Sequence, residues 1–261
     1  MANPAFSNSP AFASGAKAAS YTKPVSSEEL DAMYGRPSAT PTDTGRMSYE
    51  DTIVKTLIAF AVLVATAVVG WMVPILMIPG AIAGLVLALV NIFKKQPSRG
   101  LILAYAAAEG LFVGGISYVF GSGFGYDIVP QAVFGTLGVV GVTLALFLSG
   151  KVRATPKMTK IFLVGMVGYA MFSLVNFGLV AFGATESMFG LRDANPIVSI
   201  GLGILIVLLA AYSLVMDFEN VKTGVERGAP RVFGWQAAFG IMVTVVWLYV
   251  EILRLLAIFR D

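Results

Sequence analysis

The chain has 261 residues, of which 57% are hydrophobic and 13% charged, with a formal net charge of +3 and a mean hydropathy of +0.82. An average soluble domain carries about 25% charged residues, so this composition excludes a soluble enzyme, a disordered chain and a nucleic-acid binder. The chain contains no cysteine and no histidine, which excludes disulfides, thiolate metal sites, zinc-protease motifs and Ser–His dyads.

Residues 1–47 form a polar segment rich in Ala, Ser, Pro and Thr, with too few apolar side chains to offset the entropy cost of ordering. The segment also lacks the apolar stretch of a signal peptide. We expect a disordered cytoplasmic tail, and the alternative is a tail that regulates the protein or binds a partner. Ser48-Tyr49-Glu50-Asp51 fits a capping box and predicts the start of a helical transmembrane domain over residues 48–261.

Seven apolar segments follow, each long enough to cross about 30 Å of hydrocarbon as a helix. Their approximate bounds are 52–73, 75–93, 100–120, 128–149, 158–182, 196–216 and 235–258. The alternation of polar and apolar residues that is typical of transmembrane strands is absent. The sequence therefore predicts an all-α membrane protein, built as a seven-transmembrane helix bundle.

Glycines recur at short spacing within these segments. Gly80-x-x-x-Gly84 lies in the second segment and Gly110-x-x-x-Gly114 in the third; others in the fourth and fifth are Gly135, Gly138, Gly141, Gly165 and Gly168. Such spacing lets helix backbones approach closely in lipid. We interpret these glycines as packing positions within the monomer, and the alternative is a dimer face or a hinge.

Basic residues are distributed asymmetrically along the chain. Of the 18, 15 lie before or at the start of the first segment, or in the connections after the second, fourth and sixth segments; the others are Arg192, Arg254 and Arg260. The positive-inside rule then predicts a cytoplasmic N-terminus and a C-terminus on the outside.

Three acidic residues lie in or beside apolar segments, where an unpaired charge is costly. Glu109 is near the middle of the third segment without a basic residue within one turn, which predicts a role in a cation or proton pathway. Asp217 ends the sixth segment at its cytoplasmic edge, either as an ordinary helix-end carboxylate or as a functional group. Glu251 lies one turn before Arg254 in the last segment, either as a local ion pair or as part of the pathway.

Four stretches resemble the Bax inhibitor family. Residues 109–117 resemble its Glu-Gly helix motif, and residues 128–136 resemble the next helix, which ends in Gly-Thr. Met216-Asp217-Phe218 matches the aspartate that ends the sixth helix, and residues 248–256 resemble the pattern of the last helix. The resemblance covers roughly residues 48–258 with the segments in the family's order, and is greatest to the bacterial YccA-like branch.

The resemblance implies a pH-sensitive calcium leak channel of a bacterial inner membrane, gated by protonation of two facing carboxylates in the last two helices. Asp217 carries over as the first carboxylate. The second falls on Glu251 by motif, or on Thr244 by counting back from Leu253-Arg254, and a threonine cannot titrate. Ca²⁺ or a proton would bind at Glu109 or Asp217, because hard cations prefer oxygen ligands.

Two other functions remain open. The first is an interaction protein that modulates a membrane-bound protease, as some bacterial relatives do, and it would bind its partner through the polar tail. A proton-coupled carrier of small solutes would need broken helices at matching positions of two repeats, and Pro74 has no clear counterpart. An enzyme is disfavoured, because intramembrane aspartyl proteases need two membrane aspartates and Asp217 stands alone. No cofactor is expected, the lipid bilayer is the expected partner, and the sequence leaves the oligomeric state open.

Overall fold

The structure, a computed structural model, describes residues 27, 44–184, 190–193 and 196–260. Residues 41–261 form one compact unit, and the helices described below belong to it. The expected tail over residues 1–47 lies outside the described residues, except for residue 27 and residues 44–47. Its disorder therefore stays a prediction.

Seven long helices, α3 to α9, lie within the described part of the chain. They are α3 (Tyr49–Met72), α4 (Met77–Phe93), α5 (Arg99–Phe124), α6 (Ile128–Leu148), α7 (Pro156–Ala181), α8 (Pro196–Glu226) and α9 (Phe233–Ile258), with short 3-10 turns at Pro74–Leu76 and Gly190–Asp193. By length and composition, all seven can cross a membrane. This confirms the predicted all-α class and its seven spanning helices.

The sixth segment is longer than we predicted. Helix α8 continues ten residues beyond the expected end at Met216, so Asp217 does not end the helix. Most of the added residues are polar or glycine, apart from Phe218, Val221 and Val225, and side-chain pairs on the helix surface support this part of the helix. Lys222 lies 3.9 Å from Glu219 and 3.8 Å from Glu226, the three- and four-residue spacings that bring side chains together on a helix.

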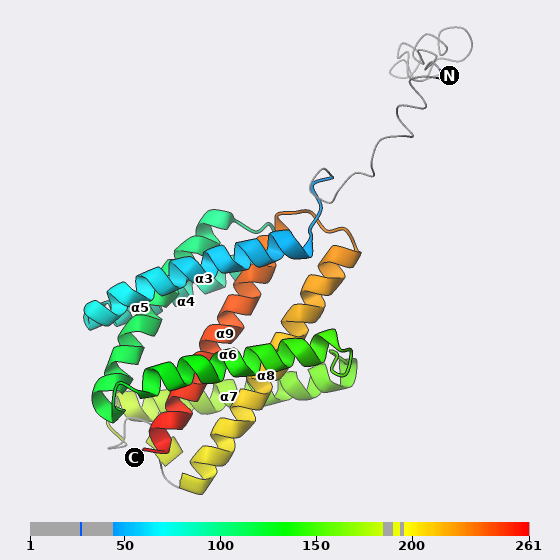
Figure 1. Cartoon of the computed structure of the whole chain (residues 1–261). Coiled ribbons are helices and arrows are strands. Elements are labelled where there is room, and N and C mark those ends of the chain that lie inside the picture. Colours follow the sequence, from blue (N-terminus) through cyan, green and yellow to red (C-terminus); the bar gives the residue numbers. More distant parts are fainter. Residues whose placement is uncertain (1–26, 28–43, 185–189, 194–195, 261) are drawn as a thin grey trace, which may run out of the picture. The chain divides into compact units, whose positions relative to one another are not determined.

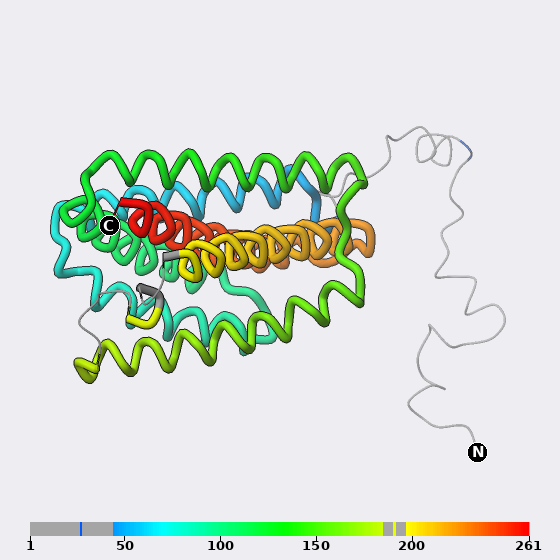
Figure 2. Tube along the Cα trace, turned by 90° about the horizontal axis from the view of Figure 1, so that it is seen from below, coloured from blue at the N-terminus to red at the C-terminus, as the bar shows by residue number. Residues whose placement is uncertain are grey.

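Helix α9 is the central element of the unit. It contacts α3, α5, α6 and α8, and it crosses between the α3–α5 group and α6 in Figure 1. Its buried side chains join two apolar clusters, one containing Leu248 and the other Met242. Helix α7 is the opposite case: along its whole described length only Phe162 is buried, and it runs along the outer side of the bundle in Figure 2.

Glycines set the spacing between α3, α4 and α5. A Cβ added to Gly114 would lie 2.7 Å from the carbonyl carbon of Ala67 in α3, and one added to Gly80 would lie 2.9 Å from the Ala108 carbonyl oxygen. Real side chains do not fit at such distances, so only glycine allows these backbones to touch. The packing interpretation is confirmed here, but not for Gly138, Gly141 and Gly168, where an added Cβ would meet no neighbouring element within 4 Å.

The start of α3 is attached to the connection between α8 and α9. Ser48 caps α3 by accepting a 3.2 Å hydrogen bond from the Asp51 amide, as the capping box predicts. The Asp51 side chain binds Lys55 and Arg231, at 2.7 Å from Arg231 Nη2, and Lys55 Nζ donates to the Arg231 carbonyl at 2.6 Å. Met47 is buried and its amide donates to the Ala229 carbonyl at 2.7 Å.

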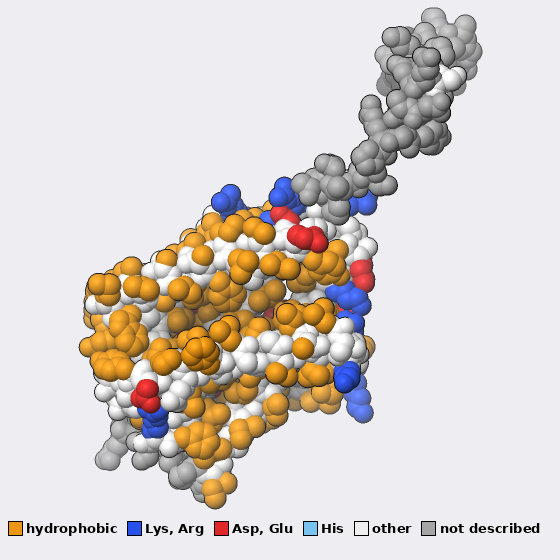
Figure 3. Space-filling view, viewed as in Figure 1, with side chains coloured by type: hydrophobic (Ala, Val, Ile, Leu, Met, Phe, Trp, Pro, Cys, Tyr) orange, Lys and Arg blue, Asp and Glu red, His pale blue; other side chains and the backbone are white. Residues whose placement is uncertain are grey.

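We call this region the basic end, meaning the start of α3 together with residues 94–98, 149–155 and 227–232 in the connections that follow α4, α6 and α8. Lys and Arg side chains gather there in Figure 3, while hydrophobic side chains cover the flanks of the helices. Apolar flanks between polar ends are the surface that a bilayer requires.

Candidate functional site

A cavity of about 540 Å³ enters the unit at the basic end. Residues of α4, α8 and α9 line it, together with Met47 from the segment before α3, and its polar side chains are those of Asn91, Asp217, Asn220 and Gln236. We call it the Asp217 cavity. Its volume lies within the range of about 300–1,000 Å³ that is usual for small-molecule sites.

Asp217 is held between α8 and α9 by a threonine. Thr244 Oγ1 donates a 2.6 Å hydrogen bond to Asp217 Oδ2, and the Ser213 hydroxyl lies 3.3 Å from Thr244 Oγ1. Gly240, one turn before Thr244, makes room for the carboxylate: a Cβ there would lie 3.3 Å from Asp217 Oδ1. Thr244 is therefore a residue of the last helix that faces Asp217. Because α8 continues to Glu226, the expectation that Asp217 is a helix-end carboxylate is wrong.

Glu251 belongs to a different site. It follows Thr244 by seven residues, about 10 Å along the axis of α9, and only 2% of it is exposed. Arg254 Nη1 donates to Glu251 Oε1 at 2.8 Å, and the Tyr169 hydroxyl of α7 donates to the same oxygen. The predicted pairing of Glu251 with Arg254 is present, and α7 contributes Tyr169 as a second partner, which spacing along one helix could not reveal.

Glu109 lies half-buried at the contact between α5 and α4. A Cβ on Gly84 would come 2.7 Å from Glu109 Oε2, so the glycine of α4 makes room for this carboxylate. The Tyr105 side chain, one turn earlier in α5, lies beside this carboxylate. Tyr105 packs edge-on against Phe239, which lines the Asp217 cavity, with ring centroids 4.9 Å apart. Glu109 itself does not line that cavity.

An apolar layer separates the two polar sites of α9. Leu214 lies three residues before Asp217, and Leu248 lies four residues after Thr244; both are fully buried in one cluster with Ala210. Along α8 and α9, packed apolar side chains therefore lie between the level of Asp217 and the level of Glu251. The arrangement places polar groups on either side of an apolar layer.

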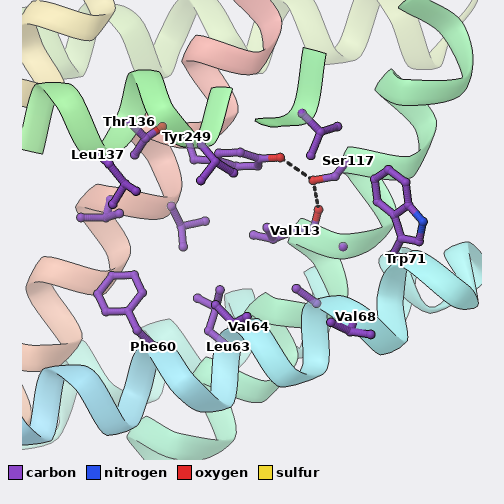
Figure 4. Close-up of a pocket in the computed structure, with 16 residues that line it drawn as sticks. Phe60, Leu63, Val64, Val68, Trp71, Val113, Ser117, Thr136, Leu137 and Tyr249 are labelled. Atoms are coloured by element: carbon purple, nitrogen blue, oxygen red, sulfur yellow. Dashed lines mark hydrogen bonds between the residues drawn. The ribbon is translucent and has the colours of Figure 1, made fainter. Parts of the chain in front are cut away.

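A separate apolar groove of about 440 Å³ opens between α3 and α6, where the surface in Figure 3 is hollowed. Ser117 and Tyr249 are polar residues in its wall, and their hydroxyls bond one another at 2.6 Å, as Figure 4 shows. Ser117 also donates to the Val113 carbonyl. Because these hydroxyls satisfy one another and the rest of the wall is largely apolar, the groove offers little for recognising a polar solute.

Metal binding by several protein ligands has no support in the part of the chain that the structure describes. No three Asp or Glu side chains come together there in a way that could hold an ion. Glu109 and Asp217 stand at separate places, Glu109 beside Tyr105 and Asp217 bonded to the Thr244 hydroxyl.

Sequence reasoning left the partner of Asp217 open and missed Gly240 and Ser213. The last segment contains a pattern that could have indicated where the partner of Asp217 lies. Small and polar residues recur there on one helical face, at Gly240, Thr244 and Glu251. The pattern identifies a face of α9 that is not purely apolar. Which helix lies against that face is a tertiary property.

Residues 3–261 match the model of the family described as Bax inhibitor 1 like. This chain belongs to the Bax inhibitor 1-like family. No curated protein matches the sequence. As a member of the family with seven helices able to span a membrane, the chain is an integral multi-pass membrane protein that contacts the lipid bilayer.

Proposed function

We propose that this Bax inhibitor 1-like protein is a cation leak channel, of the YccA-like branch, in a bacterial inner membrane. One observation carries the proposal: a carboxylate lines a cavity at the basic end, and a fully buried apolar cluster lies one turn beyond it along α8 and α9. Family membership supports the class of function, and Ca²⁺ is the ion that the family resemblance favours.

The orientation of the path follows from the charges. Of the 18 Lys and Arg residues, 15 lie in residues 1–55 or in and beside the connections at the basic end, which favours placement of this end in the cytoplasm. The Asp217 cavity then opens to the cytoplasm, residues 1–47 form a cytoplasmic tail, and Arg260 lies outside.

The chemistry of the cavity suits a cation in transit. Its oxygen ligands are the carboxylate of Asp217 and the amide carbonyls of Asn91, Asn220 and Gln236, which are groups that hard cations accept together with water. A single carboxylate binds such an ion weakly, and conduction requires that an ion can leave again.

The contact between α8 and α9 is the gate. Leu214 and Leu248 must separate before an ion can pass, and the hydrogen bond between Thr244 and Asp217 joins the same two helices. A proton on Asp217 removes the charge that attracts the cation and weakens the bond that holds the helices together. Since Thr244 cannot ionise, one carboxylate rather than a pair sets the response to pH.

Calcium flux into dye-loaded liposomes, measured at a mildly acidic and a mildly alkaline pH, tests this assignment. We expect flux through the parent protein to differ between the two conditions, and flux through Asp217→Asn to be the same in both. Asp127→Asn, at the far end of the unit, is the control and should keep the parent's behaviour. Glu109→Gln should keep the pH dependence as well.

Two results contradict the proposal. Flux no greater than in protein-free liposomes, for folded parent protein at either pH, means that the chain is not a leak channel. A pH dependence that survives in Asp217→Asn but disappears in Glu109→Gln moves the path to the contact between α4 and α5. Gel filtration of each variant in detergent checks that the protein is folded.

A further inference from the structure

A third cavity, of about 590 Å³, lies between α5, α7 and α9, away from the basic end. We call it the Arg254 cavity. Its α5 wall is apolar and includes Phe112, Ile116 and Phe120, which recur every four residues along one face of the helix. Its α7 wall carries polar side chains at a similar spacing, and Arg254 of α9 also lines it. The cavity is thus apolar on one side and polar on the other.

The α7 wall contains a buried hydroxyl without a partner. Among the residues that the structure describes, three buried side-chain atoms lack a hydrogen bond: Ser173 Oγ, Arg153 Nη1 and Glu219 Oε2. The last two form an ion pair with each other at 3.7 Å, which leaves Ser173 Oγ as the atom without any counterpart. Native proteins rarely bury a polar atom unsatisfied, so such an atom in a cavity wall indicates a ligand that bonds it.

Arg254 supplies donors beside the same cavity. Its Nη1 binds Glu251, whose oxygen is also held by Tyr169, so the charge of Glu251 is shared between two donors. The guanidinium has five N–H groups in a planar fork, and about a quarter of the Arg254 side chain is exposed. Fork geometry suits phosphate or carboxylate oxygens, which accept two parallel hydrogen bonds.

The position of these groups matches a lipid. Arg254 and Asn176 lie about one turn from the ends of α9 and α7, the depth at which a headgroup meets the acyl region. The apolar wall of α5 extends from there towards the middle of the helix. At ~30 Å³ for each water-sized group, the cavity has room for about 20 non-hydrogen atoms, which is one acyl chain with part of a headgroup.

We propose that the Arg254 cavity binds one anionic phospholipid from the leaflet at the C-terminal end of α9. The phosphate accepts hydrogen bonds from Arg254 and Ser173, and one acyl chain lies along Phe112 and Ile116. The lipid fills the gap that leaves α7 so little buried and joins this helix to α5 and α9. The inference is independent of the channel proposal, since it concerns a different cavity.

Native mass spectrometry of the detergent-purified protein, with phosphatidylglycerol or phosphatidylcholine of the same acyl chains added, tests the site. We expect phosphatidylglycerol to bind at least about tenfold more tightly and to raise the melting temperature. Both lipids carry the phosphate, but in phosphatidylcholine the trimethylammonium cation neutralises it and would lie close to the Arg254 guanidinium, which weakens the charge-assisted hydrogen bond. Inorganic phosphate and oleate separate other sources of an oxyanion. Tighter binding of either than of phosphatidylglycerol would overturn the assignment to a phospholipid.

Two variants locate the binding. Ser173→Ala removes the unpartnered hydroxyl, so without lipid the variant should be at least as stable as the parent. The rise in melting temperature caused by phosphatidylglycerol should be smaller in this variant than in the parent. The double variant Glu251→Gln with Arg254→Gln removes both charges without leaving either buried alone, and should bind phosphatidylglycerol and phosphatidylcholine equally. Ser122→Ala, an exposed serine of α5, is the matched control and should behave like the parent.

The proposal fails if the double variant retains the parent's preference for phosphatidylglycerol, because the lipid then binds elsewhere on the surface. It fails equally if the folded parent binds both phospholipids alike. If the double variant does not fold, Ser173→Ala decides the question. A rise in melting temperature with phosphatidylglycerol that is as large in this variant as in the parent excludes the cavity as the site.

Discussion

Replacing Thr244 by valine isolates the hydrogen bond at the centre of the candidate site. Valine has nearly the shape of threonine, so the α8–α9 packing is preserved while Asp217 loses its 2.6 Å donor. Asp217 is half-buried and lines a cavity, so losing this hydrogen bond should cost about 0.5–1.5 kcal/mol, the usual net value of one bond. The equilibrium constant for unfolding should rise about 2-fold to 12-fold, since each ~1.4 kcal/mol is a factor of ten.

The matched control is Thr136→Val. Thr136 is buried to the same degree, with 4% exposed against 5% for Thr244, but its hydroxyl donates only to the Ala132 carbonyl of its own helix. That carbonyl keeps its bond within the helix, so the control should change the free energy of unfolding little. Reversible unfolding in mixed micelles measures both variants. Equal losses, or a Thr244→Val protein as stable as the parent, would refute the assignment of Thr244 as the partner that stabilises Asp217.

Two further outcomes are expected elsewhere in the unit. Gly114→Ala places a methyl 2.7 Å from the Ala67 carbonyl carbon and 2.8 Å from the Trp71 nitrogen, so α3 must shift. We expect this variant to lose about 1–3 kcal/mol of stability in thermal melts. Gly138→Ala is the control and should cost nothing, because its added methyl has nothing within 4 Å. At the end opposite the basic end, hydrogen bonds from the Arg260 guanidinium hold the pKa of the Asp127 carboxyl below its ordinary 3.8. This ion pair therefore stabilises the fold above pH 3.8, and its contribution is lost as the pH falls through the lowered pKa. The melting temperatures of the parent and of Asp127→Asn should converge in acid. A difference in melting temperature that stays constant at every pH would contradict the pairing.

Much of the architecture could be predicted from the sequence because the relevant physics is local. A bilayer leaves no water for backbone groups, so an apolar run of about 20 residues becomes a helix whatever its neighbours are. The glycines of α4 and α5 indicated close contacts between helices for a similar reason, because a residue without a side chain lets a neighbouring helix backbone approach closely. The same locality explains the error in α8, where polar residues after Met216 continue the helix through surface pairs that hydropathy does not register.

The candidate site depended on tertiary structure. The last helix offers both Thr244 and Glu251 on one face, and only the rotation of α8 and α9 about their axes decides that Thr244 meets Asp217. The same packing places Tyr169 of α7 against Glu251 and Gly84 of α4 against Glu109. Hydropathy sets which segments cross the membrane, but it assigns no partner to a carboxylate, because side-chain contacts between helices depend on how the whole set packs together.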